Sequence, residues 1–395
     1  MYEVMEIKPG IHWIGVKDPD LRTFDDLFPT NCGTTYNSFL VKGSEKIAII
    51  DTVKRNRSGE FLAKVNQMIN PADVDYYVVN HTEPDHSGSL ALMLEHSPKA
   101  TVVSTQAART FLGNLIHTNF TSHVVKDGEV IDLGGRHLRF INAPFLHWPD
   151  TMFTMLEEDG VLFTCDAFGA HYSGPSIFAD ELPDYADEME FYFDCIMRPF
   201  KDKALAAIEK IRGERLDILC PSHGPIIRQE PWRPINTYEK WCLPEGEGKK
   251  AAILYLSPHG NTERMAAAVA KGATAAGVIA ETCHITQRSA GFIRDLMETS
   301  DALIFGIPTI NRDIPKPMWD VLAWLSTVRL KTDIGGVFGS YGWSGEACRF
   351  AEERLKALNF KLPAASVRAP FTPRPEAILQ CEALGRGVAE EALKK

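Results

Sequence analysis

The sequence predicts an α/β protein of two domains, a layered unit of sheets and helices followed by a doubly wound parallel sheet of five strands. Two observations predict this arrangement. Up to about residue 241 many short strands have only a few helices between them, whereas from residue 251 strands and helices alternate strictly. A polar stretch with glycine and proline at 242–250 separates the two patterns. We therefore expect domains at 1–247 and 248–395, in keeping with the length of 395 residues.

In the first half, short apolar runs separated by glycine-containing turns predict the strands. Many strands with interspersed helices predict two sheets covered by helices. The expected strands are 38–41, 46–51, 75–80, 100–104, 124–125, 130–133, 137–142, 151–157, 161–164 and 218–220, and the expected helices are 61–69 and 204–212.

In the second half, five strands alternate with five helices, which is typical of a doubly wound parallel sheet. The expected strands are 251–256, 279–284, 302–305, 336–339 and 361–367, and the expected helices are 262–276, 292–299, 317–326, 345–358 and 375–393.

Composition and charge exclude several classes of protein. The formal charge of −10 argues against a nucleic-acid partner, which needs a basic surface. No apolar run reaches the roughly 18 residues of a membrane helix, and the N-terminus lacks the pattern of a secretory signal. The eight cysteines form no C-x-x-C pair, so we expect free thiols in a reducing cytoplasm and no rubredoxin-type or zinc-ribbon site.

A cluster of potential metal ligands directly follows the strand expected at 75–80. It reads His81-Thr82-Glu83-Pro84-Asp85-His86. An isolated histidine after a strand is usually structural, but four such residues together would crowd several charges unless a cation held them. We expect Pro84 to prevent a helix here. In an extended loop, His81, Glu83 and Asp85 would then share one side and His86 would face another, so that one loop could serve two metals.

Three further candidate ligands, His147, Asp166 and His223, also follow expected strands. Ligands gathered from loops at one edge of a sheet are a common way to build a site on an α/β scaffold. Mixed ligation by imidazole and carboxylate suits iron or manganese, and an aspartate can bridge two ions. Ligand type alone does not exclude zinc.

Three loops at the carboxyl ends of strands in the second half predict a flavin site. The first, 257–262, opens a helix and offers N–H and hydroxyl groups to a phosphate; it has neither the lysine of a nucleotide P-loop nor a G-x-G-x-x-G pattern. Tyr341 and Trp343 could flank an isoalloxazine ring. The predicted flavin mononucleotide (FMN) contacts are Ser257, His259, Gly260, Asn261, Thr262, Pro308, Thr309, Ile310, Asn311, Ser340, Tyr341, Gly342, Trp343 and Gly345.

These motifs together resemble the flavodiiron proteins, also called A-type flavoproteins. The His-x-x-x-Asp-His loop and Asp51 are similar to the metallo-β-lactamase fold, whose hydrolases usually carry a histidine where this chain has Glu83. The segments 33–37 and 146–150 and the flavodoxin-like second half extend the resemblance to essentially the whole chain. The fold it implies is a metallo-β-lactamase-like αββα sandwich followed by a flavodoxin-like domain.

The resemblance also implies roles for individual residues. The implied centre holds two iron ions: His81, Glu83 and His147 on one, Asp85, His86 and His223 on the other, and Asp166 as the bridge. In some members the residue matching His86 swings away from its iron. Many members have a pocket histidine where this chain has 24–26, Phe-Asp-Asp, so His171 and Tyr192 are our candidates for catalytic pocket groups.

The activity implied by the resemblance is reduction of dioxygen to water, of nitric oxide to nitrous oxide, or both. The implied assembly is a head-to-tail homodimer or a dimer of dimers, reduced by a separate donor such as a rubredoxin or a reduced deazaflavin coenzyme. Two alternatives are a zinc metallo-hydrolase with an appended flavodoxin domain and a non-enzymatic electron-transfer module. About two irons and one flavin per chain would favour the reductase. Zinc in a colourless protein would favour the metallo-hydrolase, and a yellow protein without metal would favour the electron-transfer module.

Overall fold

The computed structural model describes residues 2–243 and 248–395, and the chain divides into two compact units after Leu243. The boundary expected between 247 and 248 falls at the end of residues 244–247, which lie outside the described residues, so its position stays a prediction.

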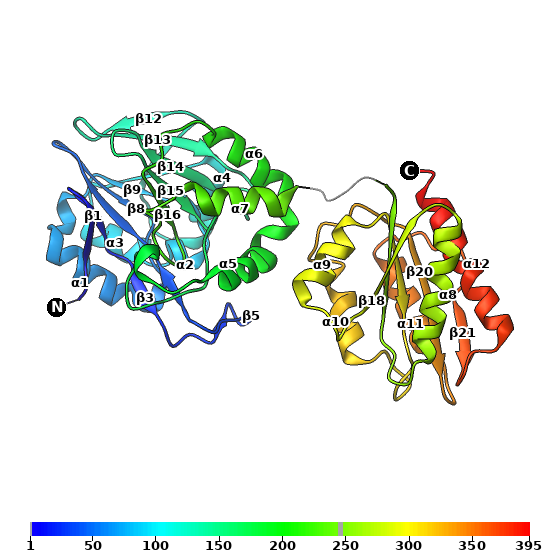
Figure 1. Cartoon of the computed structure of the whole chain (residues 1–395). Helices are drawn as coiled ribbons and strands as arrows, with labels where there is room; N and C mark the ends of the chain where they lie inside the picture. The colour runs from blue at the N-terminus through cyan, green and yellow to red at the C-terminus, as the bar shows by residue number, and fades with distance from the viewer. Residues whose placement is uncertain (1, 244–247) are drawn as a thin grey trace. The chain divides into compact units, whose positions relative to one another are not determined.

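The first unit contains two main sheets (Figure 1). Its larger sheet has seven strands in the order β1-β2-β7-β8-β9-β10-β11, and its smaller sheet has five in the order β12-β13-β14-β15-β16. The bounds are β1 (Met5–Lys8), β2 (Ile11–Trp13), β7 (Phe39–Lys42), β8 (Ile47–Ile50), β9 (Tyr76–Val78), β10 (Thr101–Ser104), β11 (Thr121–Val124), β12 (Val130–Asp132), β13 (His137–Asn142), β14 (Met152–Leu156), β15 (Val161–Cys165) and β16 (Ile218–Pro221). Two short antiparallel pairs complete the unit. One joins β3 (Val16–Asp18) to β6 (Thr34–Tyr36), and the other joins β4 (Thr23–Phe24) to β5 (Phe28–Pro29).

The core of this unit lies between the two sheets, with helices on their outer faces. Phe39 of β7 and Phe163 of β15 meet across the sheets, with ring centroids 4.9 Å apart. Phe61 and Val65, four residues apart on α1, pack on the larger sheet. Figure 1 shows α1 and α3 on one side of the strands and α6 and α7 on the other, so the αββα sandwich is confirmed. The helices are α1 (Ser58–Met68), α2 (Pro84–Ser87), α3 (Leu90–His96), α4 (Gln106–Leu115), α5 (Ala186–Tyr192), α6 (Lys201–Ile211) and α7 (Trp232–Cys242).

One local expectation was wrong. Residues Pro84–Ser87 form the short helix α2, with Pro84 as its first residue. Proline is tolerated at that position because the first N–H groups of a helix have no intrahelical partner anyway. The ligand cluster therefore turns instead of running straight, which changes which side chains face each other.

The second unit is a parallel sheet in the order β18-β17-β19-β20-β21, with helices on both faces. This confirms the doubly wound, flavodoxin-like fold. The last strand begins at Val367, later than the expected 361, because Lys361 makes only an isolated bridge to Ile334 before Pro363 interrupts pairing. The bounds are β17 (Lys250–Tyr255), β18 (Ile279–His284), β19 (Ala302–Gly306), β20 (Gly335–Tyr341), β21 (Val367–Pro370), α8 (Asn261–Ala275), α9 (Ala290–Thr299), α10 (Lys316–Trp324), α11 (Ala347–Ala357) and α12 (Pro375–Ala392).

Helices α8 and α12 pack closely on one face of this sheet because glycines stand at their contact. A Cβ on Gly385 of α12 would overlap the carbonyl oxygen of Val269, and one on Gly272 of α8 would overlap that of Glu382. The two backbones therefore approach to a separation that only glycine permits. Among the helices of the described residues, α12 included, none is both long and apolar enough to span a bilayer.

Candidate metal centre and flavin pocket

The candidate ligands of the first unit sit where strands of both sheets end. His81 lies shortly after β9 of the larger sheet, and Asp166 directly follows β15 of the smaller one. Cys165, the last residue of β15, has a left-handed backbone with φ +50°, which turns the chain at this point. Such a conformation costs a non-glycine residue about 1–2 kcal/mol, so the surrounding structure must hold it.

Glu83 lies among the first group of candidate ligands. Its Oε2 is 3.2 Å from Nε2 of His81 and 3.0 Å from Nε2 of His147. Oδ2 of Asp166 is 3.6 Å from both of these nitrogens. Four side chains thus converge from three separate segments of the chain.

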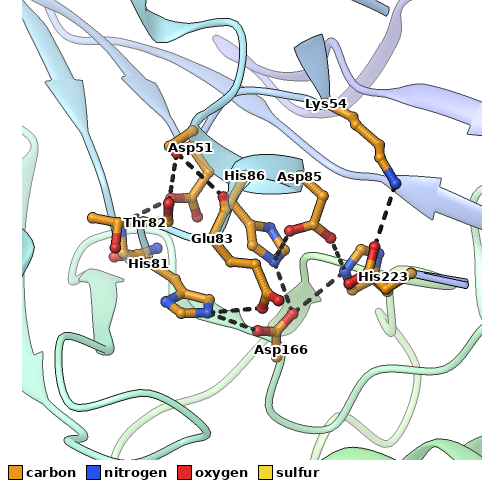
Figure 2. A network of polar contacts seen from close by, with 12 residues as sticks. Asp51, Lys54, His81, Thr82, Glu83, Asp85, His86, Asp166 and His223 are labelled. Atoms are coloured by element: carbon orange, nitrogen blue, oxygen red, sulfur yellow. Dashed lines mark hydrogen bonds and ion pairs between the residues drawn. The ribbon is translucent and has the colours of Figure 1, made fainter. Parts of the chain in front are cut away.

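The second group forms on the other side of Asp166. Nε2 of His86 is 3.3 Å from Oδ1 of Asp85 and 3.0 Å from Oδ1 of Asp166. Nε2 of His223 is 3.0 Å from Oδ2 of Asp85 and 3.4 Å from Oδ1 of Asp166. Figure 2 shows Asp166 between His81 on one side and His223 on the other. Asp166 therefore presents one oxygen to each group.

Several polar atoms of this cluster lack hydrogen-bond partners, and a pair of cations would satisfy them. Both carboxylate oxygens of Asp85 and of Asp166, and Nε2 of His86, are buried and make no hydrogen bond within the described residues. No hydrogen bond accounts for the short distances between these atoms. The atoms instead converge on common points that cations could occupy. Two sets of ligand atoms could each hold a metal ion, one from His81, Glu83, His86 and Asp166, the other from Asp85, His86 and His223. His147 belongs to neither set and joins the cluster through its contact with Glu83.

The electrostatics of the cluster also favour a cation. Burial alone would lower the pKa of His86, but the carboxylates of Asp166 and Asp85 raise it well above its ordinary value. Burial likewise opposes the charged form of His81, yet hydrogen bonds to Asp150 and Glu83 raise its pKa to about 10. Without a metal, protons on the imidazoles would have to balance the carboxylates. Metal ions would take over that role, because ligating histidines must be neutral.

We therefore expect metal binding to the metal-free protein at pH 7 to release protons and to strengthen as pH rises. Titration calorimetry with ferrous iron under argon, in buffers of different ionisation enthalpy, measures the release. The raised pKa of His81 stabilises the metal-free fold fully below the ordinary value of 6.5, and that contribution is lost as pH rises through about 10. Uptake of protons on binding would contradict this expectation.

Two of the candidate ligand histidines are oriented by hydrogen bonds at Nδ1, the ring nitrogen that does not face the cluster. Asp150 is 3.2 Å from Nδ1 of His81 and accepts hydrogen bonds from the N–H and hydroxyl of Thr82, both at 2.8 Å. Nδ1 of His223 donates to the carbonyl of Thr35 at 2.6 Å. Nδ1 of His86, in contrast, has no hydrogen-bond partner within the described residues. His86 is accordingly the least anchored of these three imidazoles.

Asp150→Asn is expected to weaken metal binding by about 10- to 100-fold, the usual cost of losing the partner behind a ligating histidine. The single oxygen of an amide would be needed by the two donors of Thr82, which would place the NH2 group, itself a donor, opposite Nδ1 of His81 and disfavour the tautomer that Asp150 imposes. Competition with a chelator of known affinity, read by metal analysis, measures the change. The matched control is Asp127→Asn, since Asp127 pairs with Lys210 at the surface; equal losses in both variants would contradict the role of Asp150.

The candidate pocket groups lie beside His223. The ring centroid of His171 is 5.5 Å from that of His223 and 4.8 Å from that of Tyr192. Both side chains are buried. Burial lowers the pKa of His171 to about 3 and raises that of Tyr192 well above its ordinary value, so both are neutral near pH 7. Their catalytic role stays a prediction.

Sequence reasoning missed one charged pair. Nζ of Lys54 lies 3.4 Å from Oδ1 of Asp25, which belongs to the segment where the resemblance led us to expect a pocket histidine. Figure 2 shows Lys54 on the side of the cluster where Asp85 and His223 lie. Burial and the negative charge of Asp85 raise the pKa of Asp25, which places this carboxyl within electrostatic reach of the centre. Lys54 lies four residues after β8, and a single lysine at such a position gives no signal in the sequence that distinguishes it from an ordinary surface lysine.

The three predicted loops of the second unit line one pocket of about 420 Å³ at the carboxyl edge of the sheet. Twelve of the fourteen predicted contacts belong to its lining; Gly260 and Gly345 do not. Gly260 instead caps α8 with a left-handed φ of +76°, and Gly345 lies under the ring of Tyr341. The lining also includes Pro258, which the prediction left out within its own loop, and Phe371, which directly follows β21, a strand expected to end earlier.

The donors of this pocket are the neutral groups expected for a flavin phosphate. The hydroxyls of Thr262 and Ser340 lie 2.8 Å apart across two loops. Tyr341, the exposed Trp343 and Phe371 supply aromatic surface on the same lining. A hydroxyl-rich helix start beside aromatic rings fits a phosphate and a planar ring system.

Comparison with protein families divides the chain in the same way. Residues 34–224 match the family described as ODP family beta lactamase, and residues 253–385 match the flavodoxin family.

Among individual proteins, a type A flavoprotein from Rhodobacter capsulatus is 37% identical over 396 residues, covering 97% of this chain and 90% of that protein. A nitric oxide reductase from Moorella thermoacetica is 37% identical over 399 residues, covering 98% and 99%. Among solved structures, the rubredoxin oxygen:oxidoreductase from Desulfovibrio gigas has a TM-score of 0.77 at 29% identity, with 99% of each chain covered. The flavodiiron protein from Giardia intestinalis has a TM-score of 0.75 at 26% identity, with 100% of this chain and 98% of that one covered.

Proposed function

This chain belongs to the flavodiiron, or type A flavoprotein, family, and we propose that it reduces dioxygen to water, nitric oxide to nitrous oxide, or both, at a diiron centre supplied with electrons by FMN. The observation that carries the proposal is Asp166, whose two oxygens face two separate groups of buried imidazole and carboxylate ligands. A carboxylate shared in this way suits a pair of iron ions.

We propose that all seven candidate ligands serve the centre. When bound, two irons would supply two electrons and an open coordination position for a small molecule. Glu83 adds a negative charge where hydrolases of this fold usually have a neutral imidazole, so it favours iron over the zinc of a hydrolase. The proposed ligands are His81, Glu83 and His147 for one iron, Asp85, His86 and His223 for the other, and Asp166 for both.

The neighbouring residues hold and shield this centre in our proposal. His171 is neutral and hydrogen-bonded through Nδ1 to the hydroxyl of Thr34 at 3.1 Å, and its buried Nε2 has no hydrogen-bond partner within the described residues. A neutral imidazole next to a ligating histidine can position a bound small molecule without repelling the metals. We propose this role for His171, with Tyr192 fixing its ring.

We propose that the second unit receives its electrons from a separate protein or coenzyme. The described residues contain eight cysteines, none in a disulfide, and no cysteine cluster that could hold a further redox metal. We propose a separate donor, a rubredoxin or a reduced deazaflavin coenzyme, and a head-to-tail homodimer, alone or paired into a tetramer, in which the FMN of one copy serves the irons of the other. Free thiols favour a reducing compartment, and we propose the cytoplasm.

Metal analysis and stopped-flow spectroscopy test the proposal together. About two irons and one FMN per chain are expected, and anaerobically reduced protein should be reoxidised by dioxygen, nitric oxide or both. Comparing the two oxidants in parallel gives the preference. Zinc without flavin would favour the metallo-hydrolase alternative, and a reduced flavin stable to both oxidants would overturn the proposed reductase.

A further inference from the structure

Asn37 is a buried residue to which the proposed function gives no role, and it holds the turn that carries His223. We call residues 221–224 the His223 turn. The side-chain Nδ2 of Asn37 donates hydrogen bonds to the carbonyl of Pro221 at 2.8 Å and to that of Gly224 at 2.9 Å. One amide group therefore bonds to both ends of the His223 turn.

The orientation of the Asn37 amide is fixed by its partners. Carbonyl oxygens only accept hydrogen bonds, so the NH2 group must face the His223 turn. The amide oxygen accepts from Nε1 of Trp13 at 2.9 Å, and an indole nitrogen only donates. Trp13 is itself fully buried, and Nζ of Lys64 lies 4.5 Å from the centroid of its ring. The opposite orientation of the amide would therefore break the hydrogen bonds on both sides.

The His223 turn is also tied to the end of β15, beside Asp166. The backbone N–H of Ser222 donates to the carbonyl of Cys165 at 2.7 Å, one residue before Asp166. The carbonyl of Ser222 accepts from the backbone N–H of Asn37 at 2.8 Å, and Asn37 lies two residues before β7 of the larger sheet. The contacts of Asn37 therefore influence where His223 stands relative to Asp166.

The second group of candidate ligands depends on this turn more than the first group does. Nδ1 of His86 has no hydrogen-bond partner within the described residues, so His223 is the one imidazole of the second group that is oriented through Nδ1. The first group has its own support, since Asp150 orients His81. Displacing the His223 turn would therefore weaken the second metal position and leave the contact between Asp150 and His81 in place.

We propose that Asn37 is a positioning residue for His223, which fixes the turn so that the second metal position binds its ion tightly; the inference rests on the proposed diiron centre. Asn37 acts through backbone carbonyls, and within the described residues it makes no hydrogen bond to a ligand side chain. Trp13 keeps the amide in the orientation that this role requires. The effect of losing Asn37 should accordingly fall on one of the two metal positions.

The test uses the whole protein after removal of its metal, with ferrous iron under argon as the probe. Asn37→Asp keeps the shape of the side chain, but the carboxylate would face the carbonyls of the His223 turn with no hydrogen to donate. Trp13→Phe keeps an aromatic ring and has no N–H donor for the amide oxygen. The matched control is Ser97→Ala, which removes buried hydrogen bonds of the same unit, to Tyr77 at 2.8 Å and to the carbonyl of Pro71 at 2.6 Å.

Competition with a chelator of known affinity resolves the two binding steps, and the Tm of the metal-free protein reports stability. We expect Asn37→Asp to weaken the second step about tenfold, the lower end of the effect seen when a group that orients a ligand is lost, with little change in the first step. Trp13→Phe should weaken the second step by a smaller factor. Ser97→Ala should lower the Tm and leave both steps as in wild type.

Two outcomes would overturn the inference. One is an unchanged second step in Asn37→Asp or, should that variant not fold, in Trp13→Phe. The other is a loss shared equally by both steps, or one of the same size in Ser97→Ala, because a merely structural role would act in that way. Failure of the proposed function would look different, since the wild-type protein itself would then not bind two ferrous ions per chain.

Discussion

Asp166→Asn is expected to remove most of the bound iron and to slow reoxidation of the reduced protein by at least about 100-fold. This exceeds the usual cost of losing a residue that only hydrogen-bonds to a metal ligand. Among the side chains of the described residues, Asp166 is the one whose oxygens face both groups of candidate ligands. An amide of the same shape removes the negative charge and one of the two ligand oxygens. Iron per chain by elemental analysis and stopped-flow reoxidation by dioxygen and nitric oxide measure the effect.

The flavin half provides the internal control for this variant. FMN content and photoreduction should match wild type, because Asp166 lies in the other compact unit. Asp180→Asn serves as the matched substitution, since Asp180 pairs with Arg228 at the surface of the same unit. Full iron content with normal reoxidation in Asp166→Asn would remove the basis of the proposed centre.

Gly385→Ala is expected to destabilise the flavin-binding unit by about 2–3 kcal/mol and to lower its Tm by roughly 5–10 °C. The added methyl group would overlap the carbonyl oxygen of Val269, which belongs to helix backbone and cannot rotate away. Calorimetry of the FMN-loaded protein, with flavin fluorescence reporting the second unit, measures the shift.

A second glycine of the same helix gives a close comparison. A Cβ on Gly387 would lie 3.7 Å from Cβ of Ala364, an ordinary contact. Gly387→Ala should therefore stabilise α12 by up to about 1 kcal/mol through helix propensity. If both substitutions shifted the Tm in the same direction and by the same amount, close packing of α8 and α12 at Gly385 would be the wrong explanation.

Much of the fold could be predicted from the sequence because burial leaves a visible pattern. The largely apolar sequences of β14 and β15, each interrupted by one threonine, mark central strands covered on both faces. Strands β1 to β6 were all missed because they contain two to four residues, too few for alternation to be read. Pro84 was misread because the same residue blocks a helix interior and favours a helix start.

The candidate ligands could be predicted because they follow strands, whereas their supports could not. Asp150 and Thr35 lie within segments that carried the resemblance, yet nothing local says that Asp150 reaches His81 or that the carbonyl of Thr35 reaches Nδ1 of His223. Such contacts join residues about 70 and 190 positions apart and depend on how the two sheets pack. The pairing of Lys54 with Asp25 was missed for the same reason.

The candidate metal ligands follow strands of both sheets of the sandwich, and this has a consequence for how the protein is made. The segment 81–86 leaves the ribosome long before His223, the last candidate ligand, which lies two residues after β16 of the second sheet. Until that strand docks, the nascent chain holds a half-built binding site with competing acidic and basic side chains. We therefore expect iron to be loaded only after nearly the whole first unit has been synthesised, and we expect a chain truncated before residue 223 to retain no metal pair.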